Sequence, residues 1–157
     1  MSLASPESRV IDGATFRIGI AASRFNEGLV DGMLARVLAG LRGAGVKDAN
    51  VSVVRVPGSH EVPWAASALA DRGRLDCIVG LGVLIAGDTN HHEMVGESVS
   101  HALQRVAIRS GIPVINGVIV VNSLAQAKVR CVGKINRGGE FASAALEMAA
   151  LKRRFSR

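Results

Sequence analysis

Aromatic residues are almost missing from this sequence. It has no tyrosine, one tryptophan and four phenylalanines among 157 residues. Proteins that bind single-stranded nucleic acid stack the bases on aromatic side chains, so few positions here could serve that purpose. The net charge of +6 does not indicate nucleic-acid binding either, because the basic residues are scattered or gathered in the tail at 152–157. We expect no nucleic-acid partner, and a small acidic or phosphorylated substrate explains the charge equally well.

Cysteines and long apolar runs are also scarce. The two cysteines, Cys77 and Cys131, have the spacing of neither a metal site nor a redox pair, so we expect buried, unreactive thiols and no bound metal. No apolar run reaches the roughly 20 residues that span a bilayer. Residues 1–6 lack the basic start and apolar block of a secretory signal. These absences predict a cytoplasmic protein that does not contact a membrane.

What the sequence does contain is regular apolar periodicity. Hydrophobic residues make up 48% of the chain, and we predict a single domain over residues 1–157 with an N-terminal arm at 1–12. Strand-like and helix-like blocks alternate, a pattern typical of a parallel sheet covered by helices on both faces. We therefore predict an α/β protein with a four-stranded parallel sheet, to which an N-terminal strand could be added. The predicted strands are residues 15–22, 51–56, 76–83 and 114–121.

Helices are predicted between and after these strands. The first carries apolar residues from 30 to 41, with Asn26 as its cap and with Gly43 and Gly45 at its end. The others cover residues 62–70, 91–110, a stretch from 123, and about 139–153. In an open parallel sheet, ligands bind beyond the carboxyl ends of the strands. Three polar stretches lie there, namely residues 24–26, 58–61 and 84–91.

The segment 87–91, Gly-Asp-Thr-Asn-His, combines a glycine, small polar residues and a helix start. Backbone N–H groups and the positive end of the helix dipole would receive an anion such as phosphate there. Asn90 and Glu93 have the spacing of a capping box. The same residues would serve an ordinary helix start, and an inward Asp88 carboxylate would oppose a phosphate.

Two histidines, His91 and His92, stand in the first turn of that helix. The dipole disfavours imidazolium there, so a histidine could exchange a proton near neutral pH. Because neighbours in a helix face different directions, we expect only one of the two to point into the cleft. A surface or capping role is the alternative for the pair.

Four more side chains are candidates. Glu61 could accept the N–H donors of a pyrimidine-like ring, and Phe25 could stack on a flat ring. Arg130 and Arg137 could pair with phosphate. The alternatives are a carboxylate that only complements a helix dipole, a phenylalanine packed on the core, and a solvated basic surface.

Taken together, these motifs resemble the lumazine synthase family, from about residue 16 to residue 154. The order and spacing of five short motifs carry the resemblance. They are Arg24-Phe25-Asn26, Val56-Pro57-Gly58-Ser59-His60-Glu61-Val62-Pro63, Gly87-Asp88-Thr89-Asn90-His91, Gln126-Ala127 with Arg130, and Asn136-Arg137-Gly138. The resemblance implies a flavodoxin-like three-layer sandwich that assembles as a homopentamer, in some members as an icosahedral shell of pentamers.

The resemblance also implies a transferase reaction in riboflavin biosynthesis that needs no cofactor and no metal. In it, 5-amino-6-(D-ribitylamino)uracil condenses with 3,4-dihydroxy-2-butanone 4-phosphate to give 6,7-dimethyl-8-ribityllumazine, phosphate and water. His91 would carry protons, Asp88, Thr89 and Arg130 would hold phosphate, and Arg137 is a further candidate. The implied substrate-binding residues are Phe25, Asn26, Ser59, His60, Glu61, Val83, Leu84, Ile85 and Asn116. The site would lie between subunits, and riboflavin synthase is a candidate partner.

Several positions depart from the usual family pattern. Ala86 replaces a common arginine, Asn116 a frequent phenylalanine and Arg137 a common lysine. His92 and Met94 stand where aromatic residues are often found, and the stretch 131–136 is shorter than in many members. Two other functions remain open on the same fold, namely dismutation of two lumazines, as in an archaeal-type riboflavin synthase, and non-catalytic binding of a flavin or lumazine.

Overall fold

Four parallel strands form the centre of the molecule in the computed structural model, which describes residues 4–156. They are β1 (Ile18–Ser23), β2 (Val51–Val56), β3 (Cys77–Ile85) and β4 (Val114–Val121), in the order β2-β1-β3-β4. The predicted four-stranded parallel sheet is therefore confirmed. Among residues 4–17 no strand precedes β1, so an added N-terminal strand is not part of this sheet.

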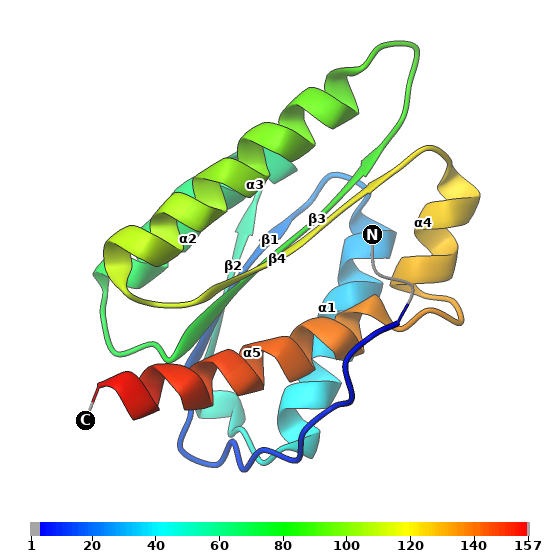
Figure 1. Ribbon diagram of the computed structural model, residues 1–157. Coiled ribbons are helices and arrows are strands. Elements are labelled where there is room, and N and C mark those ends of the chain that lie inside the picture. The colour runs from blue at the N-terminus through cyan, green and yellow to red at the C-terminus, as the bar shows by residue number, and fades with distance from the viewer. Residues whose placement is uncertain (1–3, 157) are drawn as a thin grey trace.

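Helices cover both faces of the sheet (Figure 1). They are α1 (Glu27–Gly43), α2 (Val62–Asp71), α3 (His91–Ser110), α4 (Leu124–Cys131) and α5 (Arg137–Phe155), with two short 3-10 turns, η1 (Asp48–Asn50) and η2 (Ser59–Glu61). Helices α2 and α3 lie on one face, and α1, α4 and α5 lie on the other (Figure 1). The result is the three-layer α/β sandwich expected from the alternating pattern. Of the helices within residues 4–156, none is both long and apolar enough to cross a bilayer.

The two faces of the central strands carry different side chains. Alternate residues such as Ile18, Ile20 and Leu81 pack in the core under α1 and α5. The opposite face combines Ile78 with small residues such as Gly80, where an added Cβ would lie 2.9 Å from Val62 Cγ1 of α2. This glycine lets α2 and α3 approach β3 closely, since any side chain would collide with them.

The predicted element boundaries are close to the observed ones. The strands at 51–56 and 114–121 and the helix at 91–110 match β2, β4 and α3. The first strand begins only at Ile18, because Arg17 donates its N–H to Asp76 Oδ2 at 2.8 Å rather than to a strand. Helix α5 begins at Arg137, earlier than predicted, because the Asn136 side chain accepts from Gly139 N at 2.9 Å and caps it.

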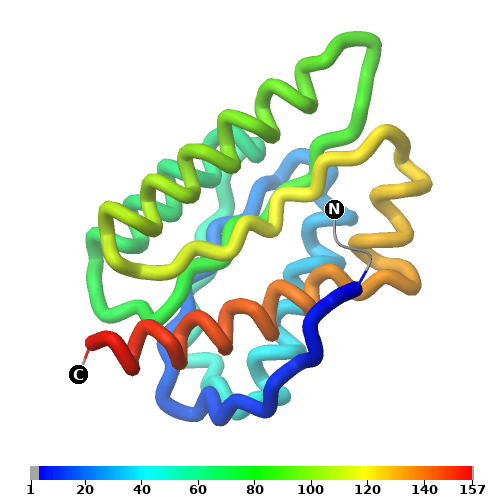
Figure 2. Tube along the Cα trace, in the orientation of Figure 1, coloured from blue at the N-terminus to red at the C-terminus, as the bar shows by residue number. Residues whose placement is uncertain are grey.

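The chain before β1 lies along α5, as Figure 2 shows. Residues 1–3 of the predicted arm lie outside the described residues. At the far end of α5, Arg153 donates to both carboxylate oxygens of Asp76 at 2.8 Å and to Thr15, and its guanidinium lies 4.8 Å from the Phe16 ring. One arginine therefore joins the starts of β1 and β3 to α5.

Asp76 is buried beside this arginine. Burial alone would raise the pKa of its carboxyl, but hydrogen bonds from Arg153 and from the Arg17 N–H, with the charges of Arg153 and Lys152, hold the pKa below its usual value. The ion pair thus favours the folded state above the unfolded pKa of about 3.9, and this contribution is lost as the pH falls through the lower folded value.

We predict that Arg153→Met lowers the free energy of unfolding near neutral pH by roughly 1–3 kcal/mol, because it leaves a buried carboxylate without its charged partner. The variant should lose less stability than the wild type on acidification below the unfolded pKa of about 3.9. Denaturant unfolding over a pH series measures both effects. Arg154→Met, at the exposed neighbouring position, is the matched control. Equal unfolding curves for Arg153→Met and wild type would contradict the prediction.

Candidate active site

A cleft of about 470 Å³ opens beyond the carboxyl ends of β1, β2 and β3, beside the first turns of α3. The connection from β3 to α3 rises past the end of the sheet there (Figure 2). The residues that line the cleft are Phe25, Asn26, Gly58, Ser59, His60, Glu61, Val83, Leu84, Ile85, Gly87, Thr89, His91, His92 and Val95. All three polar stretches that the sequence places at strand ends therefore contribute to one cavity.

The exit of β1 is fixed by bonds to its neighbouring strands. Asn26 has a left-handed backbone, with φ 56°. Its side chain makes no capping bond to α1, so the prediction that it caps this helix is wrong. It donates instead from Nδ2 to Val83 O of β3 at 2.9 Å. The Phe25 N–H donates to Pro57 O, beyond β2, at 3.0 Å. These bonds leave the Phe25 ring 71% exposed at the mouth of the cleft, with its flat face available to a ligand.

The turn η2 forms the second wall. Glu61 Oε2 accepts from Gly58 N at 2.8 Å, and Oε1 lies 3.9 Å from Nδ1 of the exposed His60. One carboxylate oxygen therefore holds the turn together, whereas the other can accept from a ligand. Ser59 is buried under the turn, above Gly82 of β3, where an added Cβ would lie 2.3 Å from Ser59 Oγ.

The third wall is the start of α3. Asn90 occupies the N-cap position, but its side chain makes no capping bond, so the predicted capping box with Glu93 is wrong. The backbone carbonyl oxygen of Asn90 accepts from the N–H groups of Glu93 and Met94, each at 3.1 Å. Within residues 4–156, the N–H groups of Asp88, Thr89 and Asn90 donate to no backbone acceptor. This loop can therefore donate to an anion without breaking a backbone bond.

Both histidines in the first turn of α3, His91 and His92, line the cleft, so the prediction that only one would do so is wrong. Neighbours on a helix differ by about 100°, which leaves His91 exposed at the mouth and turns His92 inward. His92 is 9% exposed, and neither ring nitrogen has a hydrogen-bond partner. The helical spacing in the sequence could have predicted that His92 is buried, since it extends the buried stripe of Val95 and Val99 by one helical turn.

Four predicted site residues lie outside the lining of this cleft. Asp88 is exposed in the loop, and only its neighbours Gly87 and Thr89 line the cavity. Asn116 accepts from Val118 N in β4, Arg130 donates to Gln126 O in α4, and Arg137 pairs with Glu140 in α5. No group of three or more metal-binding side chains occurs within the described part of the chain.

The two thiols take no part in the cleft. Both cysteines are buried, as predicted. Burial raises the pKa of the Cys77 thiol to about 12, and it also raises the pKa of Cys131. Neither forms a thiolate readily, so neither is a nucleophile near neutral pH.

We predict that Gly82→Ala displaces Ser59 and destabilises the fold by roughly 1–3 kcal/mol, since the new methyl group overlaps the buried hydroxyl. Ser59→Gly in the same chain removes the colliding atoms and should recover most of the loss. Thermal unfolding of the two single variants and the double variant measures the coupling. Simple additivity of the two single effects would show that the collision is not the cause.

Comparison with known proteins agrees with this geometry. The profile of the family described as 6,7-dimethyl-8-ribityllumazine synthase matches residues 15–153. A protein of that name from Thermococcus kodakarensis is 39% identical over 152 residues, covering 94% of this chain and 96% of the relative. Relatives of the same name from Stenotrophomonas maltophilia and Xanthomonas oryzae are 41% and 39% identical and cover 86% and 87% of the chain, and 88% and 90% of their own lengths. This chain belongs to the 6,7-dimethyl-8-ribityllumazine synthase family.

Proposed function

We propose that this cleft is where the chain forms 6,7-dimethyl-8-ribityllumazine in riboflavin biosynthesis. The substrates are 5-amino-6-(D-ribitylamino)uracil and 3,4-dihydroxy-2-butanone 4-phosphate, and phosphate and water are released. One observation carries the proposal. Segments 25–26, 58–61, 83–85 and 87–95, which are far apart in the sequence, line one cavity that offers a flat ring, a carboxylate, free N–H groups and a histidine. Each corresponds to a part of the two substrates.

The pyrimidine and its ribityl chain occupy the side formed by β1, η2 and β3. The exposed Phe25 ring stacks on the pyrimidine, because flat rings pack well in an offset arrangement. Glu61 lines the cleft, and its Oε1, which does not bond to the turn, accepts from substrate N–H or O–H groups. The apolar edges of Val83, Leu84 and Ile85 exclude water from the ring.

The phosphate of the second substrate occupies the start of α3. The N–H groups at 88–90, which donate to no backbone acceptor, are available to the phosphate, and the 20-residue helix adds its dipole. Thr89 lines the cavity at this point. Arg130 provides the counter-charge, but it extends from α4 and does not line the cleft of its own chain.

His91 carries protons between the two substrates. Attack of the ring amine on the ketone gives an imine and releases water, which requires a proton to leave the amine and a proton to reach the departing oxygen. Elimination of phosphate and closure of the second ring need further transfers of the same kind. His91 is exposed and lines the cleft beside Gly87 and Thr89 of the loop, a position that supports its role in these transfers. Most of the acceleration then comes from holding both substrates together.

The chain works as a pentamer-based homo-oligomer in the cytoplasm. In this arrangement Asn116 and Arg130 of one subunit complete the cleft of its neighbour. Two observations support the arrangement: both side chains lie outside the cleft of their own chain, and α2 carries a 74% exposed tryptophan, Trp64, that an interface would cover. Riboflavin synthase, the enzyme that would use the product, is the partner we expect.

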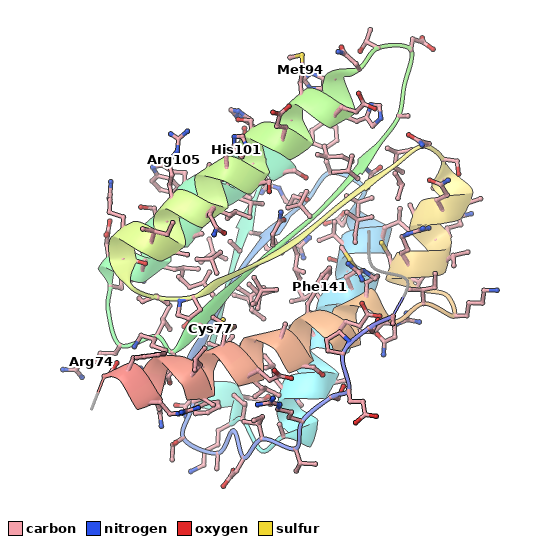
Figure 3. The ribbon with its side chains drawn as sticks, viewed as in Figure 1. Arg74, Cys77, Met94, His101, Arg105 and Phe141 are labelled. Atoms are coloured by element: carbon pink, nitrogen blue, oxygen red, sulfur yellow. The ribbon has the colours of Figure 1, made fainter. Side chains whose placement is uncertain are left out.

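We predict that His91→Ala reduces kcat by roughly 10²–10⁴-fold, the usual contribution of a general acid–base group. Arg130→Ala should reduce turnover by roughly 10²–10³-fold, since it removes positive charge at the leaving phosphate. Fluorescence of the lumazine formed from both substrates measures the rate. His101→Ala, on the outer side of α3 (Figure 3), is the matched control and should retain wild-type activity.

The same assay separates the other functions on this fold. Riboflavin formed from lumazine alone would identify a dismutating enzyme. Tight binding of flavin with no turnover of the two substrates would identify a carrier. Either result would contradict the proposed condensation.

We predict a mass of five times the 16.4 kDa of one chain, or a multiple of that, in sedimentation. Co-expression of His91→Ala with Arg130→Ala tests whether the site is shared between chains. Mixed pentamers should regain about a quarter of the wild-type sites, because some clefts receive His91 from one variant and Arg130 from the other. Pentamers that contain both variants yet stay inactive would show that each chain forms its own site.

A further inference from the structure

His92 is the most unusual side chain of the cleft. It is 9% exposed, and both ring nitrogens are covered without any hydrogen-bond partner. Leaving a buried donor or acceptor unpaired is unfavourable, and such groups are rare in folded proteins. The same cavity wall contains Ser59, whose buried hydroxyl is also without a partner, and behind it lies the unpartnered Ser23 hydroxyl. Unsatisfied polar atoms are thus concentrated at the cleft.

No bond within the described residues holds the imidazole in its present orientation. His92 lines the cleft, and both of its ring nitrogens are covered. A half-turn about Cβ–Cγ exchanges ring carbons with nitrogens in nearly the same volume. Because neither nitrogen has a hydrogen bond that must break, the ring can reorient toward a ligand with little opposition.

We propose that His92 is a substrate-binding residue whose imidazole hydrogen-bonds to a hydroxyl of the ribityl chain. This inference rests on the proposed function. Neutral imidazole offers one donor and one acceptor, and a hydroxyl is itself both donor and acceptor. The phosphate end already has the free N–H groups of the loop at 88–90, which match an anion better than a neutral imidazole does.

The position of His92 also favours the ribityl chain. It lies on the inward face of α3, the helix that packs against η2, where Ser59 and Glu61 supply further polar atoms. His91, one residue earlier, stays at the exposed mouth. The two histidines therefore have different roles. His91 transfers protons at the reacting atoms, and His92 lies deeper and binds the ribityl chain.

The test compares His92→Phe, which keeps a flat ring and removes both nitrogens, with His92→Gln, which keeps a donor and an acceptor. His101→Phe, also on α3 but on its outer side (Figure 3), is the matched control. Binding of two ligands to the assembled full-length variants is measured by fluorescence titration. The ligands are 6,7-dimethyl-8-ribityllumazine and 6,7,8-trimethyllumazine, in which a methyl group replaces the ribityl chain.

In His92→Phe we expect the Kd of the ribityl compound to rise roughly threefold to tenfold, the effect of losing one hydrogen bond between neutral groups. The Kd of the trimethyl compound should not change. His92→Gln should bind the ribityl compound more tightly than His92→Phe does. The melting temperature of the ligand-free protein should not fall in His92→Phe, because the removed nitrogens make no bond in the protein.

A lower melting temperature with unchanged Kd values would overturn the inference, because it describes a purely structural histidine. Equal weakening of both ligands would also overturn it, since the lost contact would then be with the ring. The failure of this inference can be distinguished from the failure of the proposed function. Wild-type protein that forms no lumazine from the two substrates contradicts that function, whereas normal turnover with an unchanged His92→Phe contradicts only the role of His92.

Discussion

The close approach of α2 and α3 to one face of β1 and β3 determines where the cleft lies. On that face, β1 presents Gly19 and Ala21, and β3 presents Gly80 and Gly82 next to Ile78. Added side chains at Gly80 and Gly82 would collide with Val62, Leu103 or Ser59. The opposite face carries large aliphatic residues, which pack against α1 and α5. Small residues therefore bring α2, η2 and α3 down onto the sheet, and the cleft forms where these elements end.

The same constraint explains how much of the structure could be predicted from the sequence. Strands buried on both faces appear as apolar runs, and helices that cover them have a 3.6-residue period, so the strand ends and the location of the cleft follow directly. Side-chain hydrogen bonds at loops do not follow from periodicity. Asn26 and Asn90 both precede helices, as caps do, but Asn26 donates across to Val83 O and Asn90 uses only its carbonyl oxygen. Those choices depend on which strand lies next to the loop, and this is decided by the tertiary fold.

The distribution of charge in the cleft gives a physical reason for the proposed assembly. Its residues include one carboxylate, Glu61, and no arginine or lysine, although the substrate it is proposed to bind carries a phosphate. Backbone N–H groups and a helix dipole attract an anion, but they supply partial charges only. A full positive charge such as that of Arg130 must come from beyond the lining of this cleft. A second copy of the chain can place it there, and a shared site then makes activity depend on the oligomer.

Stability and binding oppose each other at the base of the cleft. Ser23, Ser59 and His92 keep buried polar atoms unpaired, and each such atom lowers the stability of the free protein. An apolar residue at position 92 would fill the same space without that loss. A histidine that is unfavourable in the free protein is best explained by a partner present only in the complex. A ligand that hydrogen-bonds to these atoms removes the unfavourable free energy of leaving them unpaired. The deep end of the cleft is therefore selective for a hydroxylated chain.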